Sequence, residues 1–299
     1  MPLSVQIGLL LALGTAFASI VGFLFKHRGA VESPDVELRR PIRTSLRLFR
    51  SRWYTLGLLI ATASWGLHVG ALALAPISLV QSVIAGGLVL LTVCADRLFA
   101  HEVTRREWIG VGLAAAGLAF LAATLDGAAE SAHSDYEVAR LAPYISACAL
   151  AAACATFAAT RSPARAGVLF GASAGLFWAA SDTAIKALSG NLGEVSAAAI
   201  ILSPLAATIA LASLAGTVVS AKSLQLGKAV PVIAVTCVAA NLLTIAAGPI
   251  VFAEPLPDET LALVARLAAF VLVVAAAAFV PAPVRAAEEL EAEAEPQPA

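Results

Sequence analysis

Apolar stretches about 20 residues long recur from one end of this 299-residue chain to the other. A helix needs about 20 apolar residues to cross a hydrocarbon core about 30 Å thick. The stretches lie at 4–25, 53–75, 77–99, 107–125, 141–160, 166–188, 195–219, 229–253 and 259–281. The sequence therefore predicts an all-α polytopic membrane protein with nine transmembrane helices.

The composition excludes an ordinary soluble domain. Hydrophobic residues make up 60% of the chain and charged residues 13%, whereas soluble domains are about 45–50% apolar and about 25% charged. The net charge of −1 gives no electrostatic footprint for nucleic acid. The main partner that the composition predicts is the lipid bilayer.

Lysine and arginine are concentrated on alternate connections between the predicted spans. The connection 26–52 is the most basic, and basic residues also follow the third, fifth, seventh and ninth spans. The other connections carry Asp and Glu. Because short loops rich in Lys and Arg stay cytoplasmic, we expect the N-terminus outside and the C-terminus in the cytoplasm. The expected location is the inner (plasma) membrane, as a multi-pass protein.

The basic connection has an amphipathic pattern of its own at 33–52. The apolar side chains that share one helical face there are Leu38, Ile42, Leu46 and Phe49. Arginines surround this face, so we expect a surface helix that lies against anionic lipid headgroups on the cytoplasmic side. The pattern is also compatible with a regulatory or partner-binding segment.

Pairs of similar segments indicate an internal repeat. Segment 74–84 aligns with 224–234, and segment 15–26 aligns with 175–186. Glu102 aligns with Glu254 at a similar offset. The repeat divides the chain into 1–125 and 126–281, followed by a disordered acidic tail at 282–299.

The predicted repeat is inverted. Aligned spans lie five apart, an odd number, so the two halves have opposite orientations in the membrane. Inverted halves related by an in-plane pseudo-two-fold axis are the architecture of alternating-access transporters. The arrangement of the sequence thus favours a transporter.

Several segments resemble the EamA-type permeases of the drug/metabolite transporter superfamily. They read PISLVQSV, AHEVTRREWIGVGLAAAG, KAVPVIAV and GPIVFAEPLPDE. The resemblance implies a permease that moves a small solute by alternating access. Such permeases usually have ten spans, and this chain lacks the opening helix. Nine spans with Lys26-His27-Arg28-Gly29 closing the first helix resemble the NIPA-type magnesium transporter branch, which implies movement of Mg²⁺ or another divalent cation as the alternative.

Polar and aromatic side chains inside the spans are the candidates for a transport pathway, because burying a polar group in a membrane is costly. They are His68, Trp65, Gln81, Trp178, Asp182, Lys186, Asn241 and Arg266. His68 is a candidate for proton coupling, because histidine is the residue type that can exchange a proton near neutral pH. Asp182 and Lys186 are four residues apart, a spacing suited to an ion pair. Arg266 is a candidate to neutralise Asp182 or to hold an anionic substrate.

The neutral candidates have two interpretations each. Gln81 and Asn241 can orient a ligand or simply bridge helices. Trp65 and Trp178 can pack against an organic solute or serve as core aromatics. The remaining motif is a seam of small residues at Gly167, Gly171 and Gly175, and its spacing predicts close helix packing.

No enzymatic signature is present, so we expect no catalytic residues, no cofactor and no resident metal. The chain has no phosphate-binding GK[ST] loop, which argues against ATP hydrolysis. Inside the predicted spans the acids are Asp96 and Asp182, near opposite ends, which argues against a dehydrated Mg²⁺ site. A non-transporting membrane scaffold remains the third hypothesis, and a homodimer remains open as the oligomeric state.

Overall fold

A computed structural model describes residues 2–34, 46–84, 132–191, 195–227 and 229–278, with isolated residues at 109, 113, 116, 117 and 193. Within these ranges the chain forms helices and no β-strand. Five helical segments are long and apolar enough to cross a membrane. They are α1 (Leu3–Val31), α3 (Arg52–Leu74), α6 (Val138–Arg161), α7 (Ala166–Ser189) preceded by the short η1 (Pro163–Arg165), and α9 (Pro204–Leu226). The remaining labelled helices are α8 (Ala197–Ile201), α10 (Ala229–Val251) and α11 (Thr260–Ala278).

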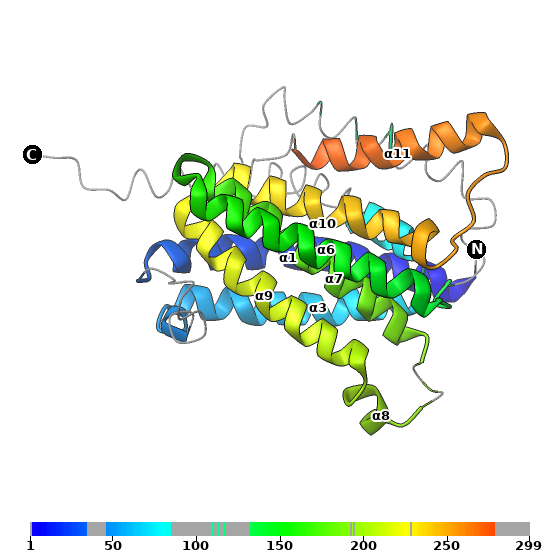
Figure 1. Cartoon of the computed structure of the whole chain (residues 1–299), viewed down its shortest axis with the longest axis horizontal. Helices are drawn as coiled ribbons and strands as arrows, with labels where there is room; N and C mark the ends of the chain where they lie inside the picture. The colour runs from blue at the N-terminus through cyan, green and yellow to red at the C-terminus, as the bar shows by residue number, and fades with distance from the viewer. Residues whose placement is uncertain are drawn as a thin grey trace, which may run out of the picture.

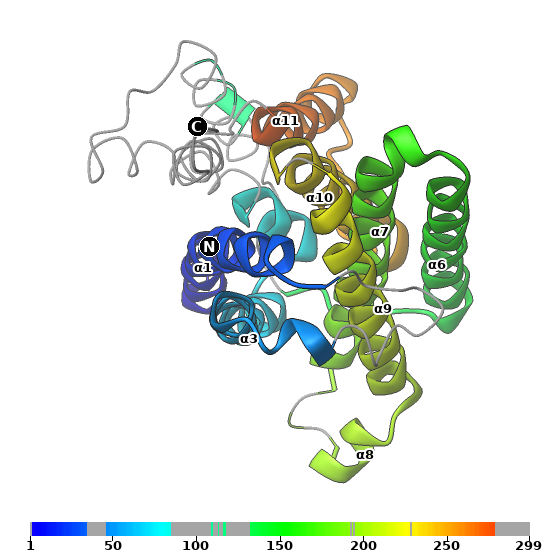
Figure 2. The ribbon, with the colours of Figure 1, turned by 90° about the vertical axis from the view of Figure 1, so that its left-hand side faces the viewer.

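The long helices lie side by side along the long axis of the molecule (Figure 1). The most extensive contacts are between α1 and α3 and between α7 and α9. Both α6 and α10 also pack on α7, while α11 packs on α10 (Figure 2). Because α7 contacts α6, α9 and α10, most of its side chains are buried.

The junction between the second and third predicted spans is as short as the sequence predicts. Ser51 caps the start of α3 by accepting a hydrogen bond from the backbone N–H of Tyr54. The helix stops before Pro76, because proline has no N–H and its ring clashes with the preceding turn. A second helical segment follows at once over 77–84.

Two predicted boundaries are wrong. The predicted span at 195–219 is instead α8 followed by α9, because Ser203 caps a new helix with Pro204 in its first turn. The first span does not end at residue 25: α1 continues to Val31. Lys26, which the charge pattern assigns to the connection, is therefore inside the helix and 8% exposed.

The predicted surface helix over 33–52 is only partly described. Residues 46–48 are helical, but a turn at 49–50 separates them from α3, so one continuous helix does not reach residue 52. Leu46 and Phe49 are exposed, as lipid-facing side chains of such a segment would be, and Leu48 is buried. Most of the spans at 77–99 and 107–125 and the whole tail at 282–299 lie outside the described residues. So do Leu38, Ile42, Asp96 and Glu102.

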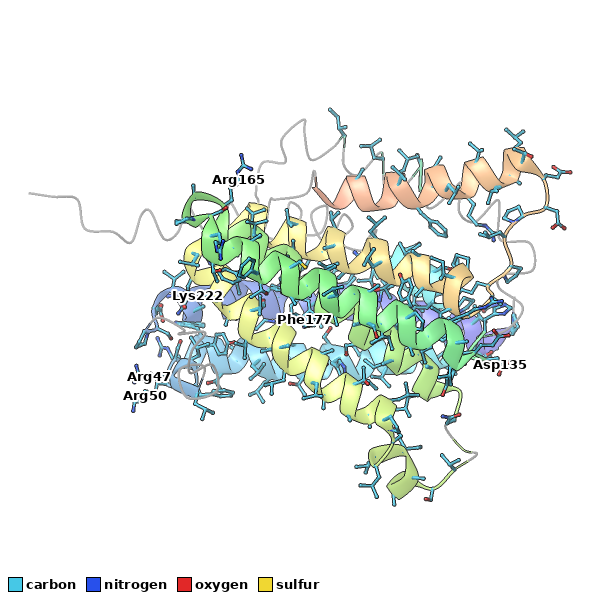
Figure 3. The ribbon with its side chains drawn as sticks, in the orientation of Figure 1. Arg47, Arg50, Asp135, Arg165, Phe177 and Lys222 are labelled. Atoms are coloured by element: carbon cyan, nitrogen blue, oxygen red, sulfur yellow. The ribbon has the colours of Figure 1, made fainter. Side chains whose placement is uncertain are left out.

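Basic side chains from several connections gather at one end of the bundle (Figure 3). Arg47, Arg50, Arg165 and Lys222 lie at one end, which we call the basic end (Figure 3). Asp135 lies at the opposite end, which we call the acidic end (Figure 3). Alternate connections of the chain thus meet at the same end, which is the arrangement that the positive-inside pattern requires.

The predicted glycine seam faces neighbouring backbone. A Cβ atom on Gly167 would lie 2.6 Å from Cα of Gly227, and one on Gly175 would lie 2.3 Å from the carbonyl oxygen of Thr236. Gly171 is similarly close to the Thr236 hydroxyl, which donates to the carbonyl of Gly171. The absence of side chains lets α7 approach the end of α9 at Gly167 and approach α10 at Gly171 and Gly175.

The Gly175→Ala variant is expected to lower stability by about 1–3 kcal/mol, because the added methyl group overlaps backbone that cannot move aside. The measurement is the thermal midpoint in detergent. Gly66→Ala is the matched control, because nothing lies within 4 Å of a Cβ there, and we expect it to be neutral or slightly stabilising. Equal midpoints for the two variants would contradict the packing described here.

Candidate functional site

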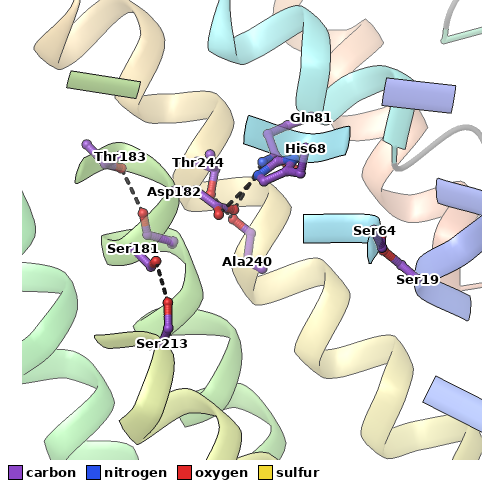
Figure 4. A network of polar contacts seen from close by, with 11 residues as sticks. Ser19, Ser64, His68, Gln81, Ser181, Asp182, Thr183, Ser213, Ala240 and Thr244 are labelled. Atoms are coloured by element: carbon purple, nitrogen blue, oxygen red, sulfur yellow. Dashed lines mark hydrogen bonds and ion pairs between the residues drawn. The ribbon is translucent and has the colours of Figure 1, made fainter. Parts of the chain in front are cut away.

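Two ionisable side chains meet between α3 and α7. His68 Nε2 lies 3.1 Å from Asp182 Oδ1, and the two side chains are only 9% and 17% exposed (Figure 4). Gln81, on the helical segment 77–84, donates from Nε2 to Asp182 Oδ2 over 3.1 Å. Both carboxylate oxygens therefore have a polar partner. We call His68, Asp182 and Gln81 the central cluster.

Helix α10 borders the central cluster. Thr244 and Ala240 face Asp182 in the close-up view, and the Thr244 hydroxyl donates to the carbonyl of Ala240 (Figure 4). Asn241, on the same helix, is buried. The fold thus brings together His68, Gln81 and Asp182, three predicted candidates from three separate segments.

Two serine pairs tie the helices around the cluster. Ser19 and Ser64 hydroxyls lie 2.8 Å apart and join α1 to α3. Ser181 and Ser213 hydroxyls lie 2.9 Å apart and join α7 to α9 (Figure 4). Each pair links the two helices that pack most extensively within its part of the chain.

The predicted ion pair between Asp182 and Lys186 is not formed. Lys186 Nζ instead donates to the carbonyls of Leu72 (2.7 Å), Ala75 (2.8 Å) and Ala132, and its side chain is fully buried. The last carbonyls of a helix have no partner within the helix and attract cations. The ammonium group of Lys186 therefore binds the carbonyls at the end of α3 and not the Asp182 carboxylate. The carboxylate oxygens of Asp182 have His68 and Gln81 as partners.

Glu254 contacts the chain just after the end of α3. It follows α10, is buried, and accepts a hydrogen bond from the backbone N–H of Ser78 at the start of segment 77–84. Burial raises the pKa of Glu254, and the hydrogen bonds from Ser78 and the charge of Lys186 oppose that rise only in part. Lys186, Glu254 and residues 75–78 form what we call the charge-capped junction. The repeat drew attention to Glu254, but nothing in its sequence context predicted this contact.

Arg266 is buried. It lies on α11 and donates from Nη1 to the carbonyl of Pro255, on the turn that joins α10 to α11. The described partners of the Asp182 carboxylate are His68 and Gln81, and its neutralisation by Arg266 stays a prediction.

The two candidate tryptophans have different environments. Trp65 is 48% exposed, because Ser64, His68 and Ala71 occupy the buried face of α3. Its indole therefore faces outward, where lipid surrounds a membrane helix. Trp178 packs edge-on against Phe23 of α1, with ring centroids 5.6 Å apart.

Lys26 is a residue that sequence analysis assigned to a loop. Its Nζ lies 4.2 Å from the ring centroid of Phe23 and 5.8 Å from that of Trp178. The one sequence signal for an interior role was its alignment with Lys186 in the repeat.

Comparisons with known proteins give no relative: no family model, no curated protein and no solved structure matches the chain. Within the described ranges no three His, Cys, Asp or Glu side chains are grouped as metal ligands would be. The arrangement of the side chains is therefore the basis for a functional assignment.

Proposed function

We propose that this protein is an integral membrane permease of the drug/metabolite transporter type, which moves a small solute by alternating access. It would have nine transmembrane helices in two inverted halves, with the basic end in the cytoplasm. The observation that carries the proposal is the contact between His68 and Asp182 at 3.1 Å. One residue belongs to each predicted half, and both lie among apolar helices.

Burying an ionisable pair among membrane helices costs free energy. Such residues therefore mark functional sites. Histidine is a residue type suited to proton coupling, because its side chain can exchange a proton near neutral pH. Movement of one half against the other would separate His68 from Asp182. The cluster therefore has the composition of a proton-coupling site.

The surrounding contacts support two similar halves. The pair α1–α3 carries the Ser19–Ser64 bond and the pair α7–α9 carries the Ser181–Ser213 bond. The predicted repeat aligns α1 with α7 and α3 with α9. A serine pair thus joins the two helices within each predicted half.

A divalent cation is the second candidate and is weaker on the described geometry. Mg²⁺ prefers oxygen ligands, usually one or two carboxylates with retained waters. Asp182 supplies one carboxylate, and its oxygens already pair with the His68 imidazole and the Gln81 amide. An organic solute is therefore favoured over Mg²⁺.

The test is uptake into proteoliposomes, with a panel of amino acids, sugars, amines and organic acids, and with Mg²⁺. Each is measured with and without a pH gradient. We expect uptake of an organic solute that the gradient stimulates, and no Mg²⁺ flux. Mg²⁺ flux without organic uptake would replace the proposal with cation transport, and fluxes equal to those of protein-free liposomes would leave a scaffold. Thr62→Ala, an exposed change on α3, is the matched control and should transport normally.

A further inference from the structure

Lys26 is a buried cation held between two helices. It lies on α1, five residues before the end of the helix at Val31, and is 8% exposed. Its ammonium group faces the ring of Phe23 on the same helix and the ring of Trp178 on α7. Such cation–π contacts stabilise an ammonium group by about 0.5–2 kcal/mol. They do not replace the water that the group loses on burial.

Lys186, which the predicted repeat aligns with Lys26, is a buried ammonium group whose lost hydration is replaced by protein groups. Lys186 donates to three backbone carbonyls and lies near the carboxylate of Glu254. Within the part of the chain that the structure describes, Lys26 has no hydrogen bond and no carboxylate partner, and the ionisable group near its ammonium is the Cys237 thiol. The three N–H donors of an ammonium group thus remain available for an anion.

We propose that Lys26 binds the anionic group of the transported solute, and that Trp178 and Phe23 pack against an apolar or aromatic body next to that group. The substrate class is then an organic monoanion. This inference rests on the proposed transport function and specifies its substrate.

The placement of Lys26 also connects the anion to the central cluster. Trp178 and Asp182 are four residues apart on α7, so they share one helical face and are separated by about 6 Å along its axis. Lys26 therefore lies against the same helix, α7, that carries Asp182.

The experiment uses the full chain in lipid-free dodecyl maltoside, where no anionic headgroup competes. Benzoate, benzylamine and benzyl alcohol are titrated while tryptophan fluorescence is recorded, because these probes share a ring and differ in charge. We expect saturable quenching by benzoate alone. We expect Lys26→Met to weaken benzoate binding about tenfold or more and Lys26→Arg to retain it.

Two further variants separate the signal from general effects. Trp178→Phe should remove the benzoate-dependent change in fluorescence, because Trp178 is the tryptophan beside Lys26. Lys222→Gln removes another cation from the basic end (Figure 3) and should leave benzoate binding unchanged. Lys26→Met is expected to fold, because an apolar replacement of a buried charge is often neutral or stabilising.

The outcomes distinguish this inference from the proposed function. Equal benzoate affinity in the wild type and Lys26→Met, or tighter binding of benzylamine, would overturn the anion site. If Lys26-dependent benzoate binding is found but proteoliposomes take up no solute, the anion site stands and the transport function fails. If uptake is found for neutral or cationic solutes and is insensitive to Lys26→Met, transport stands and the anion site fails.

Discussion

Replacing Asp182 by asparagine is expected to uncouple solute accumulation from the pH gradient. The asparagine oxygen can still accept the hydrogen bond from Gln81, so the local packing is retained. The carboxylate charge of the proposed proton-coupling pair is lost. One pH unit stores about 1.4 kcal/mol per proton, enough for about tenfold accumulation by one-to-one cotransport. The variant should reach equal concentrations inside and outside, with no accumulation.

Solute exchange measured without a gradient provides the contrast. Asp182→Asn should exchange labelled solute within about threefold of the wild-type rate, since solute movement does not itself require the proton in that assay. His68→Gln should show the same uncoupling, and the double variant should be no worse than either one, because the residues act as a unit. Thr183→Val is the control, since its hydroxyl bonds only to the carbonyl of Ala179 in its own helix. Normal accumulation by Asp182→Asn would refute the coupling role.

Lys186→Met is expected to be the most destabilising single change at the charge-capped junction. It leaves the carbonyls of Leu72 and Ala75 without the ammonium donor and removes the cation near buried Glu254. Removing one partner from a buried ionic arrangement costs about 3–5 kcal/mol. At about 2–4 °C per kcal/mol, the thermal midpoint in detergent should fall by roughly 10 °C.

The stability lost in Lys186→Met is expected to depend on pH through the charge of Glu254. Burial already raises the pKa of Glu254 above its ordinary value of 4.5, and removing Lys186 raises it further. Neutral Glu254 needs no cation, so the loss of stability should be greatest above that raised pKa and should shrink as the pH falls through it. Glu254→Gln in the Lys186→Met background should recover part of the loss at high pH. Arg140→Met, an exposed change on α6, should shift the midpoint little, and a pH-independent loss in Lys186→Met would contradict the role of Glu254.

Hydropathy predicted the helices well because length and apolar content are local properties. The five long described helices fall at predicted spans, with α3 and α7 matching to within one residue at each end. The misplaced start of α9 came from capping chemistry: the run AAAII is as apolar as a span, and only Ser203 with Pro204 marks the break. The end of α1 was misplaced because Lys26 is charged, and a charge is ordinarily a boundary signal.

The site was predictable in membership but not in pairing. His68, Gln81 and Asp182 stood out because polar groups are rare in apolar spans. Their meeting required the contact between α3 and α7. The spacing of Asp182 and Lys186 pointed to a local ion pair, yet the exposed carbonyls at the end of α3 gave Lys186 a better environment. Glu254 could not be paired with Ser78, 176 residues away, from sequence.

The amino-acid sequence alone determined that this chain is helical, apolar and divided by charge between alternate connections. These properties depend on the residues in one segment at a time, through hydropathy, helix length and the cost of moving charge across lipid. Tertiary structure alone decided which buried charges compensate one another. That choice depends on distances between helices far apart in the chain. Packing therefore set Asp182 against His68, placed Lys186 at the end of α3 and left Lys26 facing aromatic rings.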